Sequence, residues 1–380
     1  MNLDPILRAE LDALEEAGLR RSLHATDVET TAGILNFAAN DYLGLSRHPA
    51  LIETARQATA RHGTGAGASR LITGTNSAVL ALEEQLAAWK EKKTALVFSS
   101  GYAAALGTIP AVVGTGDTII LDKLAHASLI DAARLSGATV RTFAHNDMSR
   151  LKTLLQKIST GKTHILIVTE SIFSMDGDAA PLRELVELKD RHGAWLLVDE
   201  AHATGLYGPT GAGLLAEAGL SARVEIVMGT LSKALGSVGG YIAGSRVLID
   251  WLINRARSFI YSTALPPGVI AASRAAVDLA RGPEGAALRG RLRENIARFH
   301  AGLPATWKNR TLSGSAIQPL ICGEASAAVQ LATTLRDRGF LIPAIRYPTV
   351  PRHAARLRVT LSATHADKDI DALNRALAMR

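Results

Sequence analysis

From residue 94 to about residue 244, the chain alternates between short apolar runs and stretches with the period of a helix. Seven of these runs are rich in β-branched residues and predict strands, at 96–98, 118–121, 140–143, 164–169, 194–198, 224–228 and 241–243. Strands that alternate with helices build a mostly parallel sheet with helices on both faces. The sequence therefore predicts an α/β fold around a large, mostly parallel, seven-stranded sheet.

The segments on either side of this region follow other patterns. The chain has 380 residues, more than the ~250–300 at which one hydrophobic core usually stops growing, so a second domain is expected. Helical periods predict helices at 3–22, 78–90, 266–282 and 325–338, strands are predicted near 316–321 and 356–361, and a capping box from Thr364 to Asp367 predicts the start of a last helix. We predict an N-terminal helix and arm over 1–40, a large domain over 41–265 and a small α+β domain over 266–380.

The composition excludes several classes of protein. The net charge of +7 suits anionic ligands, but no run of Lys and Arg is long enough to indicate nucleic-acid binding. Cys322 is the only cysteine, which excludes an intrachain disulfide and a cysteine-rich metal site. The N-terminal segment lacks the apolar core of a signal peptide, and no apolar run reaches the ~20 residues of a membrane span. We expect a cytoplasmic protein without metal, nucleic-acid partner or membrane anchor.

Polar residues follow two of the predicted strands. Asp199 and His202 come directly after the apolar run 194–198, and Lys233 follows the run 224–228. A carboxylate at a strand end is often a helix cap or part of a surface ion pair, and a lysine among hydroxyl residues and glycines is often solvated. A desolvated lysine, however, becomes a neutral nucleophile easily. Taken singly, these residues leave both interpretations open.

A third strand runs through Ser100 and Gly101 into the start of a helix at Tyr102. Backbone N–H groups at such a start are free to hold a phosphate. The glycine-rich stretch at 63–67 does not follow a strand, so it is interpreted as a tight or flexible segment rather than a dinucleotide loop.

The order of these parts resembles that of fold-type I enzymes that use pyridoxal 5′-phosphate (PLP), and the local sequences resemble the α-oxoamine synthases. The matching segments are Asn40-Asp-Tyr-Leu-Gly44, Ser100-Gly-Tyr102, Asp122-Lys-Leu-Ala-His126-Ala-Ser, Thr169-Glu-Ser-Ile-Phe-Ser174-Met-Asp-Gly177, Asp199-Glu-Ala-His202 and Thr230-Leu-Ser-Lys233. The match runs from roughly residue 35 to the C-terminus.

The resemblance implies a role for each matched residue around PLP. Lys233 carries the cofactor as an imine and then removes the Cα proton of the amino acid. His126 stacks on the ring, although an isolated histidine there would be interpreted as a core residue. Asp199 pairs with the pyridinium nitrogen, which keeps the ring an electron acceptor. The remaining cofactor contacts come from side chains or backbone of Gly101, Tyr102, Ser174, His202 and Thr230.

The resemblance also implies how the substrates bind. Arg358 holds the amino-acid carboxylate, with Asn40 assisting, unless it is only an exposed residue of a basic strand. Thr349 contacts substrate. Arg20 meets the distal carboxylate of the acyl chain, with Arg21 as its rival and a solvated helix face as the alternative. A homodimer with shared sites is implied, in which Ser262 and Thr263 add to the partner's phosphate pocket.

Within the family, Ala344-Ile-Arg346-Tyr-Pro-Thr349-Val-Pro351 and Ala355-Arg-Leu-Arg358-Val-Thr-Leu are similar to the C-terminal signature of one member, although Pro is frequent where this chain has Tyr347. That member joins L-alanine to a pimeloyl thioester, on CoA or on a carrier protein, with loss of CO₂ in biotin synthesis. Two alternatives stay open: a sister enzyme that uses glycine or serine with another acyl-CoA, and a non-catalytic subunit of the same fold.

Overall fold

The computed structural model describes residues 2–23, 25–26, 33–158, 163–308 and 313–379. The chain forms two compact units. The larger comprises Asn40–Ser174 and Asp178–Leu292, and the smaller comprises Met1–Ala39, Met175–Gly177 and Arg293–Arg380. Toward the C-terminus, the larger unit ends at Leu292 and the smaller resumes at Arg293, so this boundary lies inside helix α12 (Pro283–Gly302).

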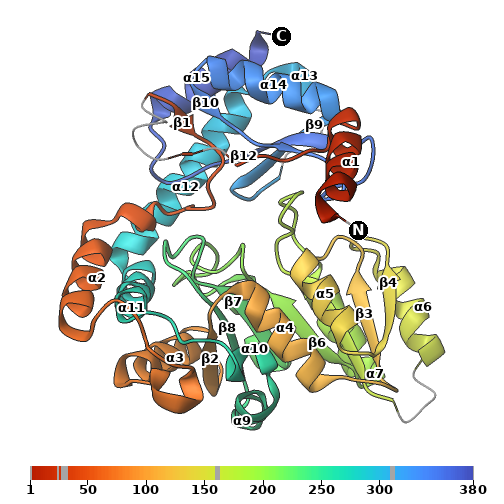
Figure 1. Cartoon of the computed structure of the whole chain (residues 1–380), viewed down its shortest axis with the longest axis vertical. Coiled ribbons are helices and arrows are strands. Elements are labelled where there is room, and N and C mark those ends of the chain that lie inside the picture. The colour runs from red at the N-terminus through yellow and green to blue at the C-terminus, as the bar shows by residue number, and fades with distance from the viewer. Residues whose placement is uncertain (1, 24, 27–32, 159–162, 309–312, 380) are drawn as a thin grey trace. The chain divides into compact units, whose positions relative to one another are not determined.

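The larger unit is built on a seven-stranded sheet in the order β2-β8-β7-β6-β5-β3-β4 (Figure 1). Its strands are β2 (Thr94–Phe98), β3 (Thr118–Asp122), β4 (Thr139–Phe143), β5 (Ile165–Glu170), β6 (Trp195–Asp199), β7 (Ile226–Thr230) and β8 (Gly240–Gly244). All neighbouring pairs from β7 to β4 are parallel, and only β8 runs antiparallel to both of its neighbours. The predicted α/β fold with a mostly parallel seven-stranded sheet is confirmed.

Helices cover both faces of this sheet. The helices α4 (Gly101–Val112) and α5 (Ala127–Leu135) lie on the face toward the viewer in Figure 1, and with α9 (Arg246–Arg255) and α10 (Arg257–Ile260) they enclose one apolar core. Helix α6 (Met148–Ile158) connects β4 to β5, and α7 (Leu182–His192) connects β5 to β6. These crossovers move across the strand order in the direction opposite to those of α4 and α5, so their right-handedness places α6 and α7 on the other face. Because both faces are covered, the central strands are apolar throughout rather than alternating.

The remaining helices of the larger unit are short or peripheral. They are η1 (Leu45–Arg47), α2 (Pro49–His62), η2 (Arg70–Gly74), α3 (Ser77–Trp89), α8 (Leu214–Glu217), η3 (Ser221–Arg223), α11 (Pro267–Arg281) and the first part of α12. None of the described helices is both long and apolar enough to span a membrane.

The smaller unit is α+β, as the sequence predicts. Strands β9 (Ile317–Gly323), β11 (Ala344–Ile345) and β12 (Ala355–Thr360) form an antiparallel sheet in the order β11-β12-β9, and β1 (Leu35–Asn36) pairs with β10 (Phe340–Leu341) in parallel. Its helices are α1 (Leu3–Glu16), α13 (Ala305–Lys308), α14 (Ala325–Asp337), α15 (Asp367–Ala378) and the last part of α12.

Two predicted helix ends are wrong. The leading helix, predicted over 3–22, ends at Glu16 because Gly18 adopts a left-handed backbone (φ 64°) and the chain turns there. The last helix does not begin with a box from Thr364 to Asp367. Its N-cap is Ala366, whose N–H donates to the Asp369 carboxylate at 3.3 Å.

Buried ion pairs anchor the ends of several strands of the larger unit. Lys90 donates to Glu200 at 3.0 Å and to Thr204 at 2.8 Å, and the other Glu200 oxygen accepts the N–H of Leu215. Both members of the Lys90–Glu200 pair are almost completely buried. A buried charge is tolerated only when it is paired and hydrogen-bonded, so this network fixes the chain directly after β6.

His145 joins two loops at the same edge of the sheet. Its Nδ1 lies 3.0 Å from Asp122 and its Nε2 lies 2.8 Å from Asp178. Asp122 is fully buried at the end of β3, and it also accepts the backbone N–H groups of Leu124 and Asn146. Burial works against a charged ring, but the hydrogen bonds to Asp122 and Asp178 raise the pKa of His145 to about 10. The imidazolium therefore fixes both loops.

Replacing His145 should weaken the fold in a pH-dependent way. Because the pKa of His145 is raised in the folded state, its contribution is complete below pH 6.5 and is lost as the pH rises through about 10. We expect His145→Gln to lower the free energy of unfolding by roughly 1–3 kcal/mol at pH 6.5, and by less above a pH of about 10. Urea unfolding of the wild type and the variant on either side of this pKa measures the difference. The exposed His62→Gln is the control, and an equal loss at both pH values would contradict the assignment.

Candidate active site

Five loops with polar side chains leave the same edge of the large sheet. The strands β2, β3, β5, β6 and β7 all run in one direction, so their carboxyl ends meet at that edge. The loops that follow them carry most of the sequence-predicted residues of the larger unit, at 99–102, 122–126, 170–174, 199–202 and 230–233. Ligands of open α/β sheets bind at this edge, where loops and helix N-termini converge.

Lys233 ends a chain of four hydrogen-bonded side chains. Its Nζ lies 2.7 Å from Nε2 of His202, and Nδ1 of His202 lies 2.6 Å from the hydroxyl oxygen of Tyr42. That hydroxyl donates to Asn40 Oδ1 at 3.1 Å. Since the single Tyr42 proton goes to Asn40, the network assigns the His202 proton to Nδ1 and leaves Nε2 to accept from Lys233. The network thus holds the amine at one place.

Asp199 is the buried acid of the site, with 4% of its surface exposed. One of its oxygens accepts the N–H of Ala201 at 2.9 Å. Burial raises the pKa of Asp199, whereas the positive charge of Lys233 and the Ala201 N–H act in the opposite direction. A carboxylate in this position would gain from a cationic ligand group that it can pair with.

His126 is the N-cap of α5, and its Nδ1 accepts the N–H of Ser128 at 3.2 Å and lies 2.8 Å from the Ser128 hydroxyl. Partial burial lowers the pKa of His126, Asp199 raises it and Lys233 lowers it. The imidazole is therefore favoured in its neutral form. Because the charges of both Asp199 and Lys233 act on the pKa of His126, the three side chains lie close enough to interact electrostatically.

The residues predicted to hold a phosphate lie at the start of α4. Ser100 is the N-cap, and its side chain accepts the N–H of Ala103 at 3.0 Å. A Cβ added to Gly101 would lie 3.7 Å from Cβ of Thr230, so the two segments face each other closely. A Cβ on Gly240 would come within 2.4 Å of the Ser100 carbonyl, which explains the glycine there. Tyr102 is the second residue of the helix, and its hydroxyl donates to Asp131.

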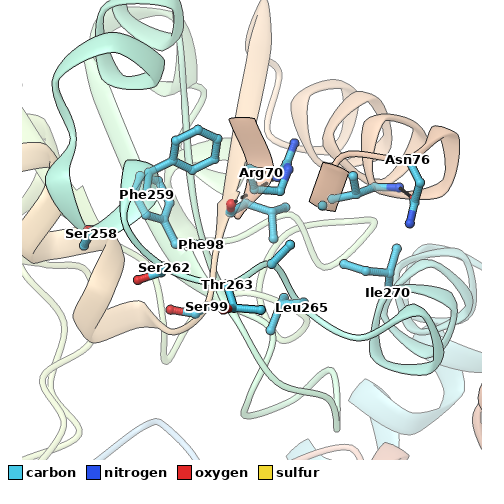
Figure 2. A pocket seen from close by; sticks show the side chains of 14 residues that line it. Arg70, Asn76, Phe98, Ser99, Ser258, Phe259, Ser262, Thr263, Leu265 and Ile270 are labelled. Carbon is cyan, nitrogen blue, oxygen red and sulfur yellow. Dashed lines mark hydrogen bonds between the residues drawn. The ribbon is translucent and has the colours of Figure 1, made fainter. Parts of the chain in front are cut away.

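Three further predicted residues lie elsewhere in the larger unit. Ser174 is buried in the loop after β5. Ser262 and Thr263 line a small pocket together with Ser99 and Arg70 (Figure 2). In this chain those hydroxyl residues share a pocket with Ser99, which comes just before the predicted phosphate-binding residues, and their addition to a partner's pocket stays a prediction.

The predicted acyl-binding residues belong to the smaller unit. Arg20, Arg21 and Thr349 line one pocket, with Arg336 and Arg346. Arg21 donates to the Thr349 hydroxyl at 3.4 Å, whereas Arg20 forms an exposed ion pair with Glu15 at 3.3 Å. The remaining walls are mostly apolar, from Val329, Ala332 and the segment 341–345. A groove with apolar walls and four guanidinium groups suits an aliphatic chain with an acidic end.

Arg358 lies in β12 of the smaller unit. Only 4% of its surface is exposed, so the alternative of an exposed residue on a basic strand is wrong. Its guanidinium donates to the Thr360 hydroxyl at 3.0 Å. Two residues earlier, the buried Arg356 forms an ion pair with the partly exposed Asp176 and thereby holds the segment 175–177, which directly follows Ser174.

Sequence reasoning missed two residues of this edge. Tyr42 lies inside the matched segment 40–44, but its aromatic ring reads as a core residue and nothing local reveals its bond to His202. Glu170 lies inside the matched segment 169–177 as the last residue of β5, opposite Asp199 in register. The signal for Glu170 is an acid that ends an apolar run, the same signal that singled out Asp199.

Comparisons with known proteins agree with this geometry. An "8-amino-7-oxononanoate synthase" of Geobacter sulfurreducens is 46% identical over 98% of this chain and 97% of its own length. Among solved structures, a serine palmitoyltransferase of Sphingomonas wittichii superposes with a TM-score of 0.90 at 32% identity, covering 99% of this chain and 97% of that one. A structure described as SPT with PLP internal aldimine gives a TM-score of 0.91 at 29% identity, covering 99% and 98%.

These similarities extend over nearly the whole chain, and the resemblance to the α-oxoamine synthases is confirmed. The family model for aminotransferase class I and II matches residues 32–377, which include every sequence-predicted site residue except Arg20 and Arg21. The chain therefore belongs to the aminotransferase class I and II family.

Proposed function

We propose that this protein is a PLP-dependent acyltransferase that condenses L-alanine with a pimeloyl thioester. The products are 8-amino-7-oxononanoate, CO₂ and the free thiol of CoA or of a carrier protein. The observation that carries the proposal is the hydrogen bond of Lys233 to His202, beside the buried Asp199 and the helix start at Gly101. The relative from Geobacter sulfurreducens bears the name of an enzyme with this product.

The donor set at the sheet edge fits PLP. Lys233 is the amine that binds the aldehyde, Asp199 is the acid for the pyridinium nitrogen, and Ser174 and His202 are the groups for the ring oxygen. The N-terminus of α4 at Gly101 and Tyr102, with the Thr230 hydroxyl, suits a phosphate. When bound, PLP supplies an electron sink for the carbanion formed at the amino-acid Cα.

The protein's own contribution is to place protons and charges. Nζ of Lys233 takes the Cα proton of alanine and later returns one to the product. His202 and Tyr42 hold this amine before substrate binds, and Asn40 fixes the tyrosine hydroxyl. Because His126 is favoured as a neutral ring, it can lie against the cofactor plane without adding a positive charge beside Lys233.

The pocket of the smaller unit suits the acyl substrate. Arg20 pairs with the distal carboxylate of the pimeloyl chain, and Arg21 supports Thr349 at the pocket wall. Arg358 holds the carboxylate of alanine through its guanidinium fork. A dicarboxylic acyl chain is therefore the substrate class that this set of arginines fits.

Rates with a substrate panel test the choice of substrates. Alanine, glycine and serine would each be assayed with pimeloyl, acetyl and palmitoyl thioesters. We expect the highest kcat/KM for alanine with pimeloyl thioester, because only the pimeloyl chain carries a distal carboxylate for the basic groove and alanine is the amino acid that the resemblance implies. If it were the poorest pair, the protein would be a sister enzyme of the family.

Replacing Lys233, which removes its amine, tests whether the protein is a PLP-dependent enzyme. We expect Lys233→Ala to lose the visible absorbance band of the bound cofactor and to lower kcat by roughly 10²–10⁴-fold, the usual worth of a positioned base. Spectra after addition of PLP and single-turnover rates measure both effects. The exposed Lys123→Ala is the control. A wild-type protein that stays colourless with PLP would favour a non-catalytic subunit.

The distal carboxylate can be tested with a paired substrate. We expect Arg20→Met to raise KM for pimeloyl thioester by roughly 10- to 100-fold, which is the cost of a lost charged hydrogen bond. KM for heptanoyl thioester, which lacks the distal carboxylate, should not change. The exposed Arg352→Met is the control, and the same experiment with Arg21→Met separates the two neighbours. An equal effect of Arg20→Met on both thioesters would contradict the role.

The homodimer with shared sites and the cytoplasmic location stay predictions. The homodimer rests on the resemblance, which assigns Ser262 and Thr263 to a partner's phosphate pocket.

A further inference from the structure

The side chain of Arg346 binds the backbone of the N-terminal arm. Its two terminal guanidinium nitrogens donate to the carbonyl oxygens of Gly18 and Arg20, the latter at 2.9 Å. Both carbonyls follow the end of α1, where the chain turns at Gly18. The donor and the two acceptors belong to the smaller unit, although more than 300 positions separate them in the sequence. These hydrogen bonds therefore tie the arm to the segment that carries Arg346.

Arg346 also shapes the turn that carries Thr349. Its backbone carbonyl accepts the N–H of Thr349 at 3.0 Å and the N–H of Val350 at 3.4 Å. The Thr349 hydroxyl in turn accepts from Arg21 at 3.4 Å. Arg346 is thus bonded to the arm through its side chain and to the turn through its backbone, and both segments line the same groove.

Hydrophobic packing does not hold the arm in place. None of the residues from 2 to 23, all of which the structure describes, is buried, and Leu19 alone among them is partly buried. Leu14, in the last turn of α1, has 42% of its surface exposed. A segment without buried apolar contacts opens at little cost in free energy. The position of the arm therefore depends on polar contacts such as those of Arg346.

The guanidinium of Arg20 is held only weakly. It pairs with Glu15 at 3.3 Å, and the two side chains are 48% and 66% exposed. Exposed ion pairs of this kind contribute little free energy, so a substrate carboxylate can take the place of Glu15. The region that this guanidinium can reach is then set by the backbone of Arg20, whose carbonyl oxygen accepts from Arg346.

We propose that Arg346 is a positioning residue, which holds Arg20 at the groove through the backbone of the arm and thereby sets the selectivity for an acyl chain with a distal carboxylate. The inference rests on the proposed function for the identity of that chain. Because the arm is already fixed before substrate binds, the substrate does not have to order it. The free-energy cost of this ordering is therefore removed from binding.

The anchoring can be measured without substrate or cofactor. The N–H groups of Leu19 and Arg20 both donate to the Leu14 carbonyl, so their hydrogen exchange reports whether the turn after α1 stays formed. We expect Arg346→Met to speed hydrogen exchange in the segment 17–23 by roughly 10-fold, because two hydrogen bonds from a charged donor are lost. Exchange followed by mass spectrometry measures this, and equal rates in wild type and Arg346→Met would overturn the proposal.

Three comparisons separate anchoring from other effects of the substitution. Arg336→Met removes a guanidinium from the same groove without touching the bonds to the arm, so exchange in 17–23 should stay as in wild type. Peptides from β6 of the larger unit report the global fold, and their exchange should not change. Arg346→Lys keeps a charged donor but not the planar fork, so it should restore part of the protection. The same acceleration in Arg336→Met would overturn the proposal.

The consequence for substrate selection is a change in KM for one of two thioesters. We expect Arg346→Met to raise KM for pimeloyl thioester by roughly 3- to 30-fold with little change in kcat, since a misplaced Arg20 weakens binding of the distal carboxylate. KM for heptanoyl thioester should not change, whereas a general structural defect would affect both. The exposed Arg352→Met is the control. If KM rose alike for both thioesters, the role in selectivity would be wrong.

A double variant distinguishes positioning from direct contact with the substrate. If Arg346 acts through Arg20, its replacement has no further effect once Arg20 is absent. KM for pimeloyl thioester in the double variant Arg20→Met, Arg346→Met should then match that of Arg20→Met within about two-fold. Effects that multiply would mean that Arg346 binds the carboxylate itself, and the positioning role would be refuted.

The two proposals fail in different ways. If the protein did not use pimeloyl thioester, the exchange measurements would still decide whether Arg346 anchors the arm. If it did use this substrate and the arm exchanged equally in wild type and Arg346→Met, the proposed condensation would stand and the role of Arg346 would fall.

Discussion

The parallel register of adjacent strands is the constraint on which the site depends. In a parallel sheet, strands that end at the same level bring their last residues side by side, as Glu170 and Asp199 show. Each such residue leaves the sheet at an edge where helix N-termini supply free N–H groups, at Gly101 and Ala127. The order and direction of the strands are therefore enough to bring side chains that are far apart in the sequence to the same edge of the sheet.

Several buried carboxyl groups lie at that edge of the sheet, and basic side chains pair with some of them. Asp122 has His145 and two backbone N–H groups, and Glu200 has Lys90. These pairs are complete, so the acids they contain belong to the scaffold. Among the residues that the structure describes, no cation is hydrogen-bonded to Asp199 or Glu170, and burial raises the pKa of both. An acid that the protein itself leaves without a full partner is where a cationic ligand gains most.

Much of this arrangement could be read from the sequence, for identifiable reasons. Strands buried on both faces are continuous apolar runs, so their ends were predicted to within two residues, and Asp199 and Lys233 were found as the polar residues after them. The end of α1 was missed because leucines continue at helical spacing beyond Gly18, and only the backbone shows the turn. The contact of Arg21 with Thr349 spans 328 positions, and no local pattern encodes it.

The miss at Glu170 is the most informative, because its signal was the one that identified Asp199. An acidic residue after an apolar run predicts a carboxyl group at a strand end, but it does not predict whether a cation lies within hydrogen-bonding distance of that group. That difference comes from the surrounding elements: Lys90, at the C-terminal end of α3, donates to Glu200, whereas Glu170 forms no ion pair with any of the described residues. Sequence fixes which carboxyls are buried, and tertiary packing then decides which of them can keep a charge. The chemistry of the site follows from the second step.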